Sequence, residues 1–169
     1  MSRLGETIAR LGLAAVVAGC SSVPILGDTQ PTNDKAIPPV VPLVAGESAQ
    51  GPWRAIAYRT SDGWTCLEVV GGPGGSSCGN GEGALLGTSW SSSGGMGDLI
   101  SGGTQADGAT GVRIRLDDGT VASAGVVPVP PPIAPPGVKA YVVVLPPGRS
   151  PVEADIVDAD GRTLETNGF

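Results

Sequence analysis

Asp-Gly pairs restrict the fold of this chain more than any other feature of its sequence. They occur at Asp62, Asp107, Asp118 and Asp160, each followed by glycine. Such pairs are typical of the tight turns between antiparallel strands, because glycine and aspartate tolerate the positive φ that those turns require. After the first twenty residues, no segment has the apolar spacing of an amphipathic helix. The pattern therefore predicts an all-β domain built largely from hairpins.

The segments beside these turns have the character of strands. Residues 112–116 alternate strictly, with three apolar side chains on one face and two arginines on the other. Residues 138–145 are apolar on both faces, which predicts a central strand that is covered on each side. With 28 glycines and 16 prolines, the chain favours a small antiparallel β-sandwich, immunoglobulin-like in outline, of about seven to nine strands. The other strands are expected at residues 53–59, 64–70, 84–90, 98–101, 120–127, 152–157 and 162–166.

Two segments of the domain are expected to lack regular pairing. Residues 71–83 contain so many glycines that their own side chains cannot order them. Residues 128–136 are rich in proline, which cannot donate ladder hydrogen bonds, so we expect an extended polyproline crossing between sheets. The alternative use of these prolines is as a ligand for an aromatic groove on a partner.

The N-terminus has the layout of a secretory signal. Arg3 and Arg10 provide positive charge, residues 11–18 form a short apolar run, and small residues then lead into a cysteine. The four residues from Val17 to Cys20 resemble the lipobox of bacterial lipoproteins. This resemblance implies that the residues before Cys20 are a signal peptide and that Cys20 becomes the lipidated first residue. It also implies an anchor at the extracytoplasmic face of the cell membrane.

Two other interpretations of the N-terminus remain open. A transmembrane helix needs about 20 apolar residues, and residues 11–18 are less than half of that length. Cleavage without lipidation would leave three cysteines, an odd number, in an oxidising compartment. Lipidation of Cys20 leaves Cys66 and Cys78 as a pair. Their disulfide would close a loop of about a dozen residues and stabilise the fold by roughly 3 kcal/mol.

The chain is thus expected to have three parts: a signal peptide at 1–19, a tether at 20–50 and a β-sandwich domain at 51–169. Proline recurs through the tether, which has no sustained period of strand or helix, so we expect a partly extended linker. The residues between Ile37 and Val44 are more apolar than a linker needs. An edge segment packed on the domain is the alternative for them.

The net charge of −6 limits the partners that the protein can have. Nucleic acid is not expected among them, because its phosphates favour clustered lysine and arginine. Electrostatic attachment to anionic lipid needs a polybasic segment, and the sequence has none. We therefore expect the membrane contact to be the acyl chains on Cys20, since two chains anchor a protein stably.

Motifs for catalysis and metal binding are incomplete. Residues 75–79 match the G-x-S-x-G motif of α/β hydrolases, but the chain has no histidine to act as the base for Ser77. The aspartates in residues 155–160 resemble a calcium loop, yet Ile156 and Asn167 stand where that loop needs acidic ligands. A hairpin turn accounts for these aspartates, with weak calcium binding of another kind as the alternative. We expect no catalytic residue, cofactor or metal.

The favoured hypothesis is a non-enzymatic binding or interaction module, whose ligand is an unidentified protein or cell-wall glycan. The alternative is a cell-wall carbohydrate-binding or carbohydrate-active surface protein, in which tryptophans stack on sugars. Two tryptophans exposed in one groove would favour this alternative, and buried tryptophans would count against it. The residues concerned are Trp53, Trp64 and Trp90, with Asp98, Asp117 or Asp118 beside them.

Overall fold

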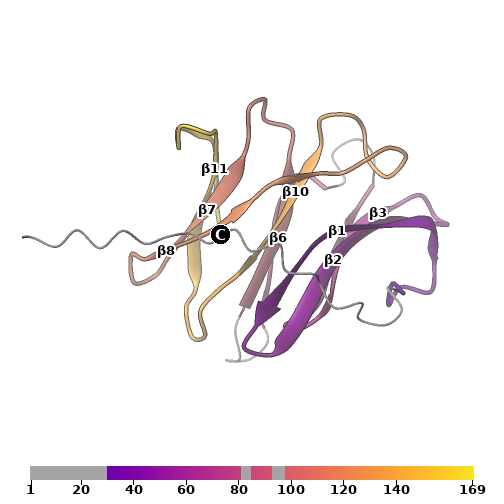
Figure 1. Cartoon of the computed structure of the whole chain (residues 1–169), viewed down its shortest axis with the longest axis horizontal. Coiled ribbons are helices and arrows are strands. Elements are labelled where there is room, and N and C mark those ends of the chain that lie inside the picture. The colour runs from indigo at the N-terminus through magenta and orange to yellow at the C-terminus, as the bar shows by residue number, and fades with distance from the viewer. Residues whose placement is uncertain (1–29, 81–84, 93–97) are drawn as a thin grey trace, which may run out of the picture.

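The computed structural model describes residues 30–80, 85–92 and 98–169 (Figure 1). These residues form twelve strands, and none of them belongs to a helix long and apolar enough to cross a membrane. The strands are β1 (Ala36–Ser48), β2 (Gly51–Thr60), β3 (Thr65–Gly71), β4 (Gly75–Gly79), β5 (Gly87–Ser92), β6 (Asp98–Thr104), β7 (Gly111–Leu116), β8 (Val121–Gly125), β9 (Val127–Pro128), β10 (Lys139–Val144), β11 (Pro151–Val157) and β12 (Thr163–Gly168).

The strands form three four-stranded antiparallel sheets that stack in layers (Figure 1). The N-terminal sheet has the order β1-β2-β3-β4, the middle sheet β5-β6-β10-β9 and the C-terminal sheet β12-β11-β7-β8. The all-β sandwich prediction is confirmed, and a third layer is added to the two that a sandwich requires. The reason lies in β10, because a strand that is apolar on both faces needs a sheet on each side.

Two apolar cores fill the spaces between the layers, and both draw on β10. Ala140 and Val142 point into the core shared with the N-terminal sheet, whereas Tyr141 and Val143 point into the core shared with the C-terminal sheet. The prediction that residues 138–145 form a strand covered on both faces is therefore confirmed.

Three of the four Asp-Gly pairs make the hairpin turns that the sequence predicts. Those at Asp62, Asp118 and Asp160 connect β2 to β3, β7 to β8 and β11 to β12. Gly63, for example, has a φ of 88°, which glycine adopts without strain. The fourth pair, at Asp107, lies between β6 and β7, where the chain passes from the middle sheet to the C-terminal sheet.

Strand β1 corrects the predicted tether at 20–50. Residues 36–48 pair antiparallel with β2, so the second half of that segment belongs to the N-terminal sheet. Prolines are tolerated there because β1 is an edge strand, and the two irregularities in its pairing fall where the prolines stand. The alternative of an edge segment is what the structure has, and the domain begins before Ala36 instead of at residue 51.

Strand β4 corrects the expectation that residues 71–83 have no regular pairing. Gly75 to Gly79 pair with β3 in register, with Cys78 directly opposite Cys66. The small side chains do not specify this strand. Its order comes from the backbone ladder to β3 and from the cysteine pair.

The proline-rich segment 128–136 is a connection within the middle sheet and not a crossing between sheets. Strand β9 pairs with β10, the Val129 N–H donates to the Val138 carbonyl at 3.0 Å, and the Ile133 N–H donates to the Pro130 carbonyl at 3.0 Å. Residues other than proline thus supply the N–H groups that the turn needs. The crossing from the C-terminal to the middle sheet lies earlier, between β8 and β9.

Candidate functional site

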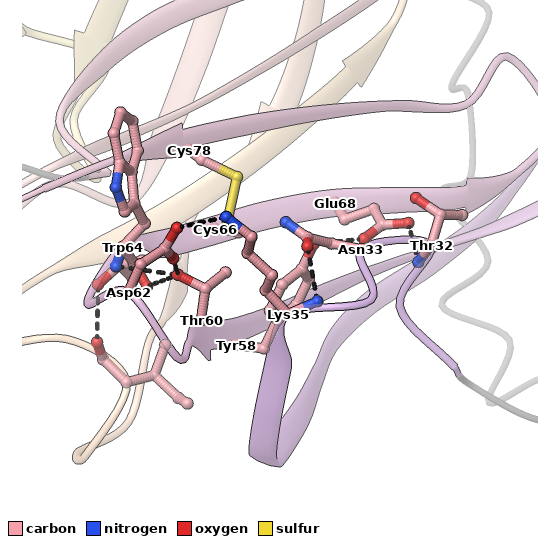
Figure 2. Close-up of a disulfide and its surroundings, with 12 residues drawn as sticks. Thr32, Asn33, Lys35, Tyr58, Thr60, Asp62, Trp64, Cys66, Glu68 and Cys78 are labelled. Atoms are coloured by element: carbon pink, nitrogen blue, oxygen red, sulfur yellow. Dashed lines mark hydrogen bonds and ion pairs between the residues drawn. A yellow bond between two sulfur atoms is a disulfide. The ribbon is translucent and has the colours of Figure 1, made fainter.

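The predicted disulfide between Cys66 and Cys78 is present and joins β3 to β4. The S–S distance is 2.07 Å and the Cα atoms are 4.1 Å apart. Cys66 is completely buried, whereas Cys78 is exposed. The bond holds the edge strand β4 against β3 close to the β2–β3 turn, on the outer face of the N-terminal sheet (Figure 2).

A groove of about 320 Å³ opens beside this disulfide, and we call it the hairpin groove. Two of its lining residues come from the segment just before β1. The others come from the end of β2, the β2–β3 turn, β3 and β4. Its lining consists of Asn33, Lys35, Thr60, Asp62, Trp64, Cys66 and Cys78.

Polar side chains in the hairpin groove form one network (Figure 2). The Lys35 ammonium lies 3.0 Å from Oδ2 of Asp62, and the Thr60 hydroxyl donates to Oδ1 of Asp62 at 2.5 Å. The Trp64 N–H donates in turn to the Thr60 hydroxyl oxygen at 3.0 Å. The turn and the segment before β1 are thereby tied together.

The network keeps both of its charged groups ionised. The hydrogen bond from Thr60, followed by that from Lys35, holds the pKa of Asp62 below its usual range. The hydrogen bond to Asp62 and its negative charge raise the pKa of Lys35 above its ordinary value. At neutral pH the groove therefore presents a carboxylate and an ammonium side by side.

Trp64 is the exposed aromatic residue of the hairpin groove, with 41% of its surface accessible. Its backbone is fixed at both polar groups, because the Thr60 N–H donates to its carbonyl at 2.9 Å and its own N–H is bonded to the Thr60 side chain. Trp53, by contrast, is buried in the core between the N-terminal and middle sheets, which counts against the expectation of two exposed tryptophans in one groove. The side chain of Trp90 lies outside what the structure describes.

A buried carboxylate lies next to the hairpin groove on the same face. Glu68 is 2% exposed, and its two oxygens accept hydrogen bonds from the Tyr58 hydroxyl at 2.7 Å and from the Thr32 N–H at 2.9 Å (Figure 2). Burial, and then the bond to Glu68, raise the pKa of Tyr58, which therefore stays a donor. No motif in the sequence points to this group, although a lone acid within the apolar run of β3 is a usable signal.

The remaining residues that the sequence singled out do not join this site. Ser77 stands in β4 opposite Leu67, and Asp118 lies at the β7–β8 turn of the C-terminal sheet, where it pairs with Arg149. Asp158 accepts the N–H groups of Asp160 and Arg162, as a hairpin turn requires. Among residues 30–80, 85–92 and 98–169, no group of acidic residues and cysteines is arranged to hold a metal. Cys20 lies outside the described residues.

A second groove of about 380 Å³ lies on the other face of the same hairpin. Arg59 and Thr65 line it from the hairpin, and the proline-rich connection forms its other wall. The Thr65 hydroxyl lies 3.5 Å from the Ile133 carbonyl, so two of the lining residues connect the hairpin to the proline-rich segment. It contains no exposed aromatic ring among its lining residues.

Comparisons of the chain with protein-family models, with curated proteins and with solved structures found no match.

Proposed function

We propose that this protein is a bacterial lipoprotein that acts as a non-enzymatic binding module at the extracytoplasmic face of the cell membrane. In this proposal, residues 1–19 are removed as a signal peptide and Cys20 carries the lipid. The ligand site is the hairpin groove. The observation that carries the binding role is a tryptophan left 41% exposed beside an ion pair, on a hairpin that a disulfide holds in place.

The disulfide supports an extracytoplasmic location, because such bonds persist in oxidising compartments. The N-terminal sheet also lies close to the proposed anchor along the chain. Only about a dozen residues separate Cys20 from Thr32, whose N–H is bonded to Glu68, and a chain of that length spans at most about 40 Å. The hairpin groove would therefore stand near the membrane surface.

The chemistry of the groove supports binding over catalysis. The chain has no histidine, and Lys35 is held protonated by Asp62, so neither an imidazole nor Lys35 supplies a general base in the groove at neutral pH. Asp62 accepts two hydrogen bonds and keeps a lowered pKa, which makes it a poor proton acceptor. Both groups are suited to holding a ligand in place.

The anchor is tested with the full chain expressed in a bacterium that processes lipoproteins. The wild-type protein is expected in the membrane fraction, with labelled palmitate and with Cys20 as its first residue. Cys20→Ala should lose the label and leave the membrane, while Cys78→Ala, as the matched cysteine control, should keep the label. Membrane retention of Cys20→Ala equal to that of the wild type, without lipid mass on the wild type, would contradict the proposal.

A further inference from the structure

The hairpin groove has the size and the polarity of a site for a small, uncharged ligand. Its volume of about 320 Å³ is at the lower end of small-molecule pockets, which run from about 300 to 1,000 Å³. The ammonium of Lys35 and the carboxylate of Asp62 neutralise each other at 3.0 Å. Neither an anion nor a cation therefore gains a net attraction, and a neutral ligand fits better.

The ion pair keeps hydrogen-bonding capacity for such a ligand. A carboxylate has about four acceptor positions and an ammonium three donors. Among the described residues, Thr60, the ion pair and the backbone of Asp62 itself use some of these positions, so others remain for a ligand. The side chains of Lys35 and Asp62 are 59% and 45% exposed, so their remaining positions face solvent. A hydroxyl group donates and accepts at once, and neighbouring hydroxyls match an acceptor that stands next to a donor.

Trp64 adds an apolar surface beside these polar groups. An indole ring offers a large flat face to the C–H groups of a ligand at little cost in conformational entropy. A protein partner would need roughly 800 Å² of contact surface on this side. The groove contains one exposed large apolar side chain, so its apolar surface suits a single ring better than a protein interface.

We propose that the hairpin groove binds a neutral saccharide, with one sugar ring on Trp64 and its hydroxyls on Asp62 and Lys35. This inference rests on the proposed role of the groove as the ligand site. The rigid setting favours it, because the disulfide and the bonds from Thr60 to Trp64 hold the site in place before any ligand arrives. The sugar can come from a soluble glycan or from the headgroup of a glycolipid.

The test uses the full mature lipoprotein in a detergent that carries no sugar. It is first applied to an array of neutral oligosaccharides, acidic oligosaccharides and peptides, and the neutral oligosaccharide with the strongest signal is then titrated by tryptophan fluorescence. Trp64→Ala should weaken binding about tenfold or more, as the loss of a central aromatic contact does. Asp62→Asn should weaken it severalfold, because the amide offers a donor where the carboxylate accepts.

The matched control is Asp118→Asn, at a second Asp-Gly turn in which a threonine hydroxyl and an arginine also contact the aspartate. This variant should leave saccharide affinity unchanged. A parallel titration with vesicles that carry a glycolipid with the same headgroup distinguishes the two sources. Binding in either arm that requires Trp64 supports the proposal.

Three results would overturn the inference: no binding to any neutral oligosaccharide, a preference for acidic glycans or peptides, or binding that Trp64→Ala leaves intact. Membrane retention through Cys20 is measured separately. A lipidated protein without saccharide binding would therefore remove the ligand class and leave the anchor standing.

Discussion

The outer face of the N-terminal sheet and the outer face of the C-terminal sheet hold their charged groups differently. On the C-terminal sheet, Arg115 pairs with Glu153 at 3.1 Å and Arg113 with Asp155 at 3.8 Å, and all four side chains are in contact with solvent. The N-terminal sheet also has an exposed pair, Lys35 with Asp62, but in addition Glu68 is buried beside Tyr58, and both its oxygens are bonded.

This difference indicates which outer face is the better candidate for a functional surface. Exposed ion pairs contribute about 0 to 1 kcal/mol each, so the pairs on the C-terminal face add little to the stability of the fold. A buried carboxylate, a disulfide and a groove with an exposed tryptophan all lie on the N-terminal face. The functional surface is therefore sought there, next to the end of the chain that leads to the proposed anchor.

The largest expected effect comes from removing the buried carboxylate. Glu68→Ala leaves the Tyr58 hydroxyl and the Thr32 N–H without their acceptor and empties the space of the side chain. The Tyr58 hydroxyl is buried, and its loss of a partner costs about 1 to 3 kcal/mol, whereas Thr32 is exposed and its N–H can bond water instead. The emptied space adds to this cost, so the free energy of unfolding should fall by roughly 3 to 5 kcal/mol. Urea unfolding of the full chain measures this change.

Glu153→Ala on the C-terminal face is the control for that comparison, and it should cost less than about 1 kcal/mol. Glu68→Gln keeps one acceptor oxygen, so its loss of unfolding free energy should lie between those of Glu68→Ala and Glu153→Ala. Equal costs for Glu68→Ala and Glu153→Ala would show that the two faces do not differ as described.

The second effect concerns the disulfide, which only the N-terminal sheet has among the described strands. Replacing Cys66 and Cys78 together by alanine releases a bond between residues 12 positions apart. The free energy of unfolding should fall by about 3 kcal/mol, because the unfolded chain regains the freedom of that loop. The change is measured by urea unfolding without reductant. A loss below about 1 kcal/mol would mean that β4 is held by its backbone ladder alone.

The smallest effect is the acid dependence of the two exposed Asp-Gly turns. The pKa of Asp118 is lowered, first by the Thr120 hydroxyl and N–H and then by Arg149, and the pKa of Asp62 is lowered in the same way by Thr60 and Lys35. Such a group stabilises the fold above its unfolded pKa, near 3.8, and this contribution is lost as pH falls through the lower folded pKa.

Asp118→Asn and Asp62→Asn should therefore each flatten the fall in unfolding free energy between about pH 5 and about pH 2. Thermal unfolding followed by circular dichroism across this range provides the measurement. If both variants change the acid dependence of the unfolding free energy by a similar amount, the two faces differ in their strands and not in their turns. An unchanged acid dependence in both variants would argue against the lowered pKa values.

Local signals in the sequence predicted the strands and turns that depend on near neighbours. The hairpin at Asp62 and the alternation of residues 112–116 needed only adjacent residues, and both are present as expected. Strands β1 and β4 were missed because proline in one and glycine in the other oppose strand formation locally. Each of them is ordered by backbone hydrogen bonds to a neighbouring strand, β2 for β1 and β3 for β4. The neighbouring strands are predictable from the sequence, but no local pattern reveals that β1 and β4 pair with them.

The hairpin groove was predictable only in part, for the same reason. Asp62 and Trp64 sit on a hairpin that the sequence showed, so their proximity follows from the turn. Lys35 and Asn33 reach the groove because β1 pairs with β2 and brings the preceding residues alongside. A segment taken as a tether could not be assigned to a site. The lipid on Cys20 stays a prediction from the lipobox.

The middle sheet has a further consequence for how the molecule melts. Because successive residues of β10 serve opposite cores, neither core can lose this strand alone. Heat that loosens one interface also withdraws support from the other. We therefore expect the three layers to unfold together in one thermal transition, and removal of either outer sheet to expose an apolar surface on the sheet between them.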